Sequence, residues 1–396
     1  MTRLWDKGNS LDTRVLEYTA GDDHALDGRL VAYDILASIA HAEMLGEQKL
    51  LSAPDLVAIR AALTAIGEEH AQGKWRVSLE QEDCQTAIEN LLTARLGAAG
   101  GRLHAGRSRN DQVLVALRLY LRDAAQTLAQ GALAVAEALN ALAARHGDQE
   151  LPGYTHMQQA MPSSVALWAL GFAAELRDDA EGLLLTQRRS SKNPLGSAAG
   201  FGTPHLDIDR EATRRRLGFA VTQEPVTAVQ LSRGKAEAQL LFEITLLTQD
   251  LGRLAADLLL FYTREFAYVS LPEAFTTGSS IMPQKRNPDV FELMRGRSAV
   301  AHAALNEVLS ITQKLTSGYH RDLQLIKPPL FRAIDSCLQT LAILPDALNG
   351  VRFRPENIRL DPSIHAAAAA NALVAQEGIP FREAYRRVAA KLKDNE

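Results

Sequence analysis

The residues with the most specific chemistry lie at positions 278–289, in the run Gly-Ser-Ser-Ile-Met-Pro-Gln-Lys-Arg-Asn-Pro-Asp. The first residues are small and flexible, so this segment can open and close over a site, and Ser279 offers a mobile hydroxyl. Lys285 and Asn287 add a cation and an amide donor within reach of one ligand. The Pro-Asp pair that ends the run is typical of a helix start. A cation, an amide and a helix N-terminus together are suited to stabilise negative charge on a carboxylate substrate.

A second polar cluster precedes the longest periodic segment of the chain. Arg107 and Arg109 alternate with Ser108 and Asn110, directly before a predicted helix. Guanidinium groups, a hydroxyl and a helix N-terminus favour the binding of carboxylates. A short basic turn of this kind is often only a solvated surface turn, but this one leads straight into a long helix, which would anchor it.

Two further polar segments connect predicted helices. His156 follows Thr155 in the loop 152–160, and histidine is the side chain best suited to move protons near neutral pH. Alone, such a histidine is more often a surface or structural residue than a catalyst. Residues 317–327 contain a tyrosine, a glutamine and a lysine. By itself this segment indicates only a polar connection between helices.

The elements that would position these residues are predicted to be helices almost throughout. The strongest pattern runs from Asp111 to Arg145, where apolar residues recur every seven positions. A seven-residue repeat without proline predicts a long helix packed against similar helices. The neighbouring row includes small residues, which permit another helix to approach closely. The repeat consists of Leu114, Leu121, Leu128, Val135 and Leu142, and the neighbouring row of Leu117, Ala124, Gly131 and Ala138.

Other helices are predicted on the same grounds. Shorter ones are expected at residues 30–46 and after an N-cap at Ser52. Few alternating β-branched runs occur, so the sequence predicts an all-α fold. Apolar rows on helices this long exceed what one subunit can cover, so we expect a homo-oligomer with the seven-residue repeat in a buried seam of the assembly. The further long helices are predicted at residues 164–189, 231–265, 288–315 and 329–348.

Composition excludes several classes of protein. The 396 residues carry a net charge of -4 with both signs mixed, so neither nucleic acid nor a membrane surface is expected as a partner. The two cysteines have no metal-binding spacing and indicate a reduced, cytoplasmic protein. No stretch within Met1–Asn9 fits a signal peptide, and no segment is expected to span a bilayer. The 10 histidines form no ligand pattern, so neither a metal nor another cofactor is expected.

The run at 278–289 resembles the signature of the fumarase/aspartase superfamily, whose members eliminate fumarate from succinyl-type substrates. Gln284 after Met-Pro is similar to the argininosuccinate lyase family within it. Fumarases and aspartases usually carry a small residue there, and adenylosuccinate lyases usually carry an aromatic one. Residues 106–112 and 154–158 resemble the other two regions that the superfamily shares.

The resemblance implies roles for the residues of these regions. Ser279 is expected to be the base and the His156–Glu292 pair the acid, and the reversed assignment of Ser279 and His156 stays open. Lys285 is expected to stabilise the negative charge that forms on the substrate. The expected substrate-binding residues are Ser108, Arg109, Asn110, Thr155, Asn287, Tyr319, Gln324 and Lys327.

The implied activity is the reversible cleavage of argininosuccinate to arginine and fumarate, a step of arginine biosynthesis. Two alternatives remain. One is another fumarate-forming lyase, acting on adenylosuccinate or malate, against which Gln284 and the set at 319–327 argue. The other is a catalytically silent structural relative, like the lens crystallins, against which the retained catalytic residues argue.

The implied fold has three mostly helical domains. Residues 1–110 would form the first, with the first shared region; residues 111–350 would form a long-helix bundle with the second and third; residues 351–396 would form a short C-terminal domain. Four subunits would join their bundles into a twenty-helix core, and each site would draw on three subunits.

Two positions and one short segment depart from the family pattern. Gln85 stands where the family usually has histidine, and Asp23 stands where many members have a substrate-binding serine. The segment Leu231-Ser232-Arg233-Gly234-Lys235 stands where many members have Ser-Asp-Arg-Asp. These changes affect individual substrate contacts, not the three shared regions.

Overall fold

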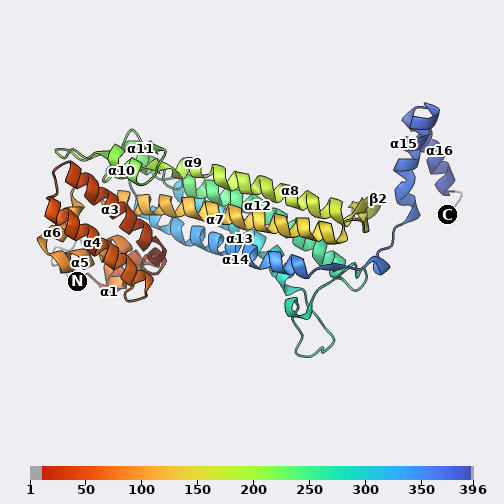
Figure 1. The fold of residues 1–396 in the computed structure, drawn as a ribbon, viewed down its shortest axis with the longest axis horizontal. Helices are drawn as coiled ribbons and strands as arrows, with labels where there is room; N and C mark the ends of the chain where they lie inside the picture. The colour runs from red at the N-terminus through yellow and green to blue at the C-terminus, as the bar shows by residue number, and fades with distance from the viewer. Residues whose placement is uncertain (1–10, 394–396) are drawn as a thin grey trace. The chain divides into compact units, whose positions relative to one another are not determined.

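The computed structural model describes residues 11–393, and they are mainly helical (Figure 1). Met1–Asn9, where the sequence predicts no signal peptide, lies outside the described residues. The chain forms two compact units. The first unit comprises the residues up to Ala129, Glu181–Thr245 and Ala299–Cys337, and the second comprises Gln130–Ala180, Leu246–Ser298 and the residues from Leu338 onward.

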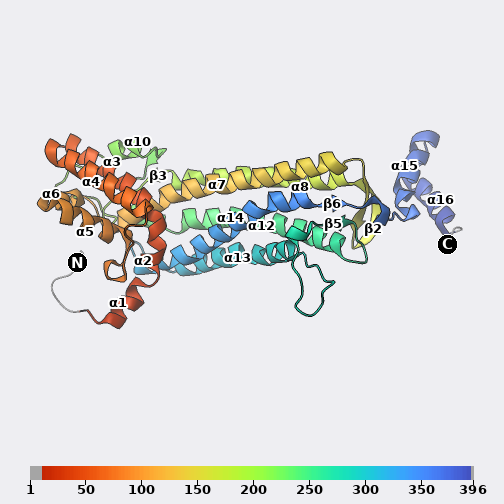
Figure 2. The ribbon, with the colours of Figure 1, turned by 60° about the horizontal axis from the view of Figure 1, so that its bottom comes forward.

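The predicted long helices are confirmed. The helix expected at 231–265 begins only at Lys235, because a turn separates α11 (Thr227–Leu231) from α12. The one expected at 164–189 ends as the short α9 (Gln187–Ser190). Within the second unit the long helices run side by side (Figures 1 and 2). The long helices are α7 (Arg109–His146), α8 (Val165–Leu185), α12 (Lys235–Tyr262), α13 (Asp289–Thr312) and α14 (Lys327–Gly350).

The seven-residue repeat of α7 is buried within the chain itself. Its five members are each at most 3% exposed. Gly131 permits α14 to approach, because an added Cβ would lie 2.9 Å from Leu341 Cδ1. This corrects the expectation that the repeat lies in a seam of an assembly, since helices of the same chain already cover it.

The expectation that no segment could span a bilayer is also wrong for α7. Among the described residues this one helix is long and apolar enough, by length and composition alone. Half of its apolar window is buried inside the protein. A buried core helix gives the same signal, so the finding is weak evidence for a membrane span.

Shorter helices make up the remainder of the helical structure. α3 (Val31–Glu47) and α4 (Ala53–Ala71) are as predicted, and Ser52 caps α4 by accepting a hydrogen bond from Asp55 N at 3.2 Å. The other helices are α1 (Thr13–Ala20), α2 (Asp23–Leu26), α5 (Cys84–Leu96), α6 (Ala98–Gly101), α10 (Arg210–Arg216), α15 (Ala366–Glu377) and α16 (Phe381–Lys393).

Strands occur in the described residues only as two-stranded pairs. The longest pair is an antiparallel hairpin of β1 (Glu150–Thr155) and β2 (Gln158–Ser164), where the sequence predicts a loop. The prediction failed because Pro152 faces Pro162 across the ladder and a bulge follows Gly153, and these residue types are uncommon inside strands. The other pairs are β3 (Lys192–Asn193) with β4 (Val221–Thr222), parallel, and β5 (Val269–Ser270) with β6 (Arg352–Phe353), antiparallel.

Candidate active site

The signature loop, residues 277–289, is closed at its base by two backbone hydrogen bonds. Thr277 N donates to Asn287 O at 3.0 Å, and Asn287 N donates to Thr277 O at 2.8 Å. The Asn287 amide also donates to Gly278 O at 3.2 Å. Residues 280–286 are exposed, and Figure 2 shows this teal loop standing off the helices beside α13. A fixed base and an exposed tip suit a segment that closes over a site.

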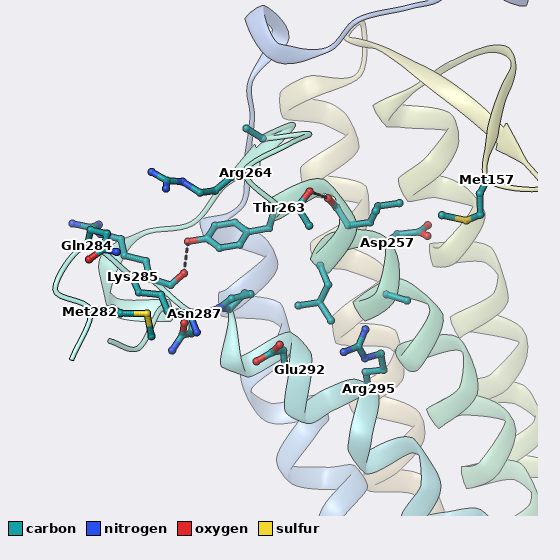
Figure 3. Close-up of a pocket in the computed structure, with 17 residues that line it drawn as sticks. Met157, Asp257, Thr263, Arg264, Met282, Gln284, Lys285, Asn287, Glu292 and Arg295 are labelled. Atoms are coloured by element: carbon teal, nitrogen blue, oxygen red, sulfur yellow. Dashed lines mark hydrogen bonds between the residues drawn. The ribbon is translucent and has the colours of Figure 1, made fainter. Parts of the chain in front are cut away.

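A pocket of about 990 Å³, here the signature pocket, lies beside this loop in the second unit. Lys285 and Asn287 line it from the loop, and Glu292 lines it from the first turns of α13. Figure 3 shows Lys285 and Asn287 on one side and Met157 on the other. The predicted cation and amide donor are therefore brought together at a helix N-terminus, an arrangement that can stabilise an anion.

Sequence reasoning missed one acid of this pocket. Asp257 of α12 lines it and accepts a hydrogen bond from Trp168 Nε1 at 2.9 Å. Burial raises the pKa of the Asp257 carboxyl, and the indole bond only partly offsets this. The residue lies in an apolar helical stretch, so no motif marks it.

His156 and Met157 form the two-residue turn of the β1–β2 hairpin. Their φ angles are 54° and 62°, in the left-handed region that a type I′ turn requires. Histidine tolerates this region better than most residues do. Both side chains are exposed, as is Thr155 at the end of β1. The hairpin therefore presents the predicted catalytic histidine at its tip.

The structure does not join His156 to Glu292. Among residues 11–393 no hydrogen bond or ion pair links them, and His156 is not among the residues lining the signature pocket. Ser279 is half-buried at the start of the loop, where its hydroxyl accepts a hydrogen bond from Ile281 N at 3.4 Å. The acid pair and the serine base thus stay predictions.

A second pocket, of about 400 Å³, lies in the first unit. Because four arginines line it, we name it the arginine-rich pocket. Its arginines are Arg107, Arg109, Arg233 and Arg321. It also gathers most of the predicted substrate-binding residues, from segments some two hundred positions apart, whereas Asn287 and Thr155 lie in the second unit. The predicted residues that line it are Ser108, Arg109, Asn110, Tyr319, Gln324 and Lys327.

Asp111 holds the first of these segments in place. Its carboxylate accepts hydrogen bonds from the backbone N–H groups of Ser108, Gly196 and Ala198, each at 2.9 Å. Burial raises the pKa of Asp111 to about 6, against the lowering effect of these bonds. The carboxylate ties the start of α7 to the 196–198 turn and so fixes the backbone of Ser108 and its neighbours.

Lys327 is held between two carboxylates. Its Nζ lies 2.9 Å from Asp23 and 2.7 Å from Asp27, and its side chain is 3% exposed. Burial acts to lower the pKa of Lys327, but the two carboxylates outweigh it and raise the pKa. Burial raises the pKa of Asp23 to about 7, although Lys327 pulls it down. The ammonium is therefore charged and fixed in position.

Sequence reasoning missed the acids that surround Arg109. Asp83 caps the unpredicted α5 by accepting from Thr86 N at 2.8 Å, and it also pairs with Arg109. The buried Glu82 lies 3.6 Å from Arg109 and 3.2 Å from Arg321. The Asp at the N-cap position was the one available signal, because aspartate is favoured before a first helical turn.

Two other pocket residues have defined partners. Gln85, at the position where the resemblance leads us to expect histidine, donates to Asp34 Oδ2 at 3.1 Å. The Gln324 amide donates to the backbone oxygens of Thr19 and Ala20, both at 3.0 Å. Because acidic partners fix Arg109 and Lys327, the pocket presents oriented cations that can bind carboxylates. No group of three or more potential metal ligands occurs in the part of the chain that the structure describes.

Comparison with known proteins agrees with these features. A family model described as "Lyase" matches residues 16–302. The chain is 48% identical over 392 residues to an argininosuccinate lyase of Sorangium cellulosum, covering 98% of this chain and 90% of that protein. It is 43% identical over 391 residues to an argininosuccinate lyase of Stenotrophomonas maltophilia, with the same coverage.

Among solved structures, an EDDS lyase variant with bound fumarate aligns with a TM-score of 0.79. That alignment covers 97% of this chain and 76% of the other at 24% identity, so it establishes a shared fold. The family match spans most of the described chain, and the curated relatives span nearly all of it. The chain therefore belongs to the lyase family, among the argininosuccinate lyases.

Proposed function

We propose that this protein cleaves argininosuccinate reversibly to arginine and fumarate. One structural observation carries the proposal: six residues expected to bind this substrate, from segments far apart in the sequence, line a single pocket. The relatives with the same name support the substrate. Gln284, which lines the signature pocket, is the residue type that distinguishes this family from other fumarate-forming lyases.

The proposed reaction is an elimination. A base removes a proton from the succinyl carbon next to a carboxylate, the C–N bond breaks, and its electron pair leaves with the guanidino nitrogen, which takes a proton from an acid. The remaining carbons form the double bond of fumarate. Before the bond breaks, negative charge collects on the carboxylate. Lys285, Asn287 and the N-terminus of α13 are the groups that would stabilise it.

We assign Ser279 as the base and the His156–Glu292 pair as the acid. A serine alkoxide is unstable near neutral pH, so Ser279 needs a closed, dry loop and a nearby cation, which Lys285 supplies. The reversed assignment, with His156 as base and Ser279 as donor, involves the same two residues.

We propose further that the protein works as a cytoplasmic homotetramer with three helical domains, at residues 1–110, 111–350 and 351–396. Apolar side chains stand exposed on the long helices, among them Leu167 at 66% and Leu293 at 60%. Where such side chains gather into one patch, they can form a surface for association. The missing contact between His156 and Glu292 in one chain supports a site completed by a second subunit.

Fumarate release, followed by its ultraviolet absorbance, tests the function. Argininosuccinate should be cleaved, whereas adenylosuccinate and malate should not. Cleavage of either of the latter with no cleavage of argininosuccinate would reassign the substrate. A well-folded protein that releases fumarate from none of the three would indicate a silent structural relative.

A further inference from the structure

The charged groups of the arginine-rich pocket do not all neutralise one another. Arg109 and Arg321 face Asp83 and Glu82, so their charges balance. Arg107 donates to Ser38 Oγ at 2.9 Å and is attracted by the buried Asp34. Two places remain out of balance: Arg233, and the cluster around Lys327.

Arg233 carries an uncommitted positive charge. The residue is 6% exposed and lines the pocket, yet its Nε and Nη1 have no hydrogen-bond partner among the described residues. Its guanidinium lies over the Tyr319 ring, with Cζ 5.8 Å from the ring centroid. Two unpaired, buried nitrogen donors on a cation are costly unless a ligand supplies the acceptor.

The turn that carries Arg233 is rigid. Arg118 Nη2 donates to Ser232 Oγ at 2.7 Å. Gly234 has a φ of +83°, and a Cβ there would lie 2.6 Å from Thr312 Cγ2, so only glycine fits. The backbone on either side of Arg233 is therefore constrained, while its guanidinium has no carboxylate partner among the described residues.

The cluster around Lys327 carries an excess negative charge. One ammonium faces the two carboxylates of Asp23 and Asp27. Asp27 is fully buried, and it also accepts a hydrogen bond from Cys84 N at 3.3 Å. Asp23 lines the pocket instead. Asp23 is thus the carboxylate that an incoming cation can reach.

A pocket with one uncommitted cation and one surplus carboxylate matches a zwitterion. We propose that Arg233 and Asp23 recognise the α-amino-acid end of the substrate, with Arg233 donating to the α-carboxylate and Asp23 accepting from the α-ammonium. The inference rests on the proposed function, since argininosuccinate ends in such a group. It makes these two residues determinants of specificity for an amino acid over a simple guanidine.

Calorimetric binding of three ligands to the full-length protein tests this assignment. The ligands are L-arginine, agmatine, which lacks the carboxylate, and 5-guanidinopentanoate, which lacks the ammonium. The wild type should bind L-arginine about 10- to 100-fold more tightly than either analogue, as expected for one charge-assisted contact. This comparison needs no variant and so does not depend on how a variant folds.

Variants then locate each contact. Arg233→Gln should abolish the preference for L-arginine over agmatine and keep the preference over 5-guanidinopentanoate. Asp23→Asn should do the reverse. Arg321→Gln is the matched control, because Arg321 already pairs with Glu82, and it should change all three affinities by a similar factor.

Two results would overturn the assignment: equal wild-type affinity for L-arginine and agmatine, or a folded Arg233→Gln variant that keeps the full preference. If the wild type still releases fumarate from argininosuccinate, only this inference fails. If it releases no fumarate and binds none of the three ligands, the proposed function fails as well.

Discussion

Lys327 is fixed before any substrate arrives, because its Nζ lies 2.9 Å from a carboxylate oxygen of Asp23 and 2.7 Å from one of Asp27. Such a group loses little conformational freedom when a ligand binds, which favours affinity. The same arrangement leaves the substrate to compete with Asp23 for that ammonium. Asp23 is an acid whose pKa is raised, so the binding of charged ligands should depend on its protonation.

The first prediction follows from Asp23. Burial raises the pKa of Asp23 to about 7, where Lys327, Asp27 and Asp83 are the charged groups that act on it. Below that pH the carboxyl is neutral and cannot attract an α-ammonium; above it the carboxylate can. The affinity for L-arginine should therefore rise between about pH 6 and about pH 8. Titration calorimetry at several pH values measures this.

Asp23→Asn supplies the control for the pH dependence, since it removes the titrating group and keeps its shape. The affinity of this variant for L-arginine should stay level over the same range. An equal slope in the wild type and the variant would assign the dependence to another group, and a wild type without any slope would contradict the prediction outright.

Ser279 is the subject of the second prediction. Ser279→Ala should reduce kcat at least ~100-fold while argininosuccinate still binds, because the loss of a base or acid acts on the transition state. Stopped-flow or steady-state fumarate release gives kcat and KM separately. Ser280→Ala, an exposed neighbour on the same loop, should remain active. Near-normal kcat in Ser279→Ala would remove the serine from the mechanism.

At the scale of elements, the long helices could be predicted and the hairpin could not. The seven-residue repeat and the helix caps depend on local interactions. The repeat places apolar residues on one face of the helix every two turns, and a cap side chain accepts hydrogen bonds from free N–H groups of the first turn. The β1–β2 hairpin instead depends on pairing between residues whose local preferences oppose strands, such as Pro152 and Pro162. Tertiary packing decides such segments.

The candidate site was predictable in its residues but not in its partners. Motifs marked Ser108, Asn110 and Lys327, and the structure places them in one pocket. The carboxylates that hold the cations come from α2 and from the turn before α5, and no spacing relates these segments to the motifs. The sequence therefore could not indicate that Arg109 and Arg321 pair with acids, whereas Arg233 forms no ion pair among the described residues.

The third prediction tests the core of α7. Leu128 is fully buried, so Leu128→Asp places an unpaired charge in an apolar seam and should lower the free energy of unfolding by several kcal/mol. Denaturant unfolding measures the loss. Gln126→Asp, at an exposed position of the same helix, is the control and should change stability by less than about 1 kcal/mol. Equal losses in both variants would mean that helix propensity, not burial, sets the cost.

At the scale of the whole molecule, the predicted site residues divide between the two compact units. The hairpin tip and the signature loop belong to the second unit, and the arginine-rich pocket belongs to the first. Apolar side chains exposed on the long helices offer surfaces for association. In the tetramer that we propose, hairpin, loop and pocket would come together from separate chains, and mixing subunits tests this proposal.

The final prediction is that two inactive variants restore activity to each other. His156→Asn and Ser279→Ala should each be inactive as homotetramers. If one site takes its histidine and its serine from different chains, hybrids will contain some sites with both residues altered and some with neither. The intact sites should turn over at the wild-type rate, so mixing and reassembly should recover activity from a minority of sites, measured as fumarate release.

Native mass spectrometry confirms that subunits have exchanged. Hybrids that form yet stay inactive would place His156 and Ser279 in the same site from the same chain, and the proposed sharing of sites would be wrong.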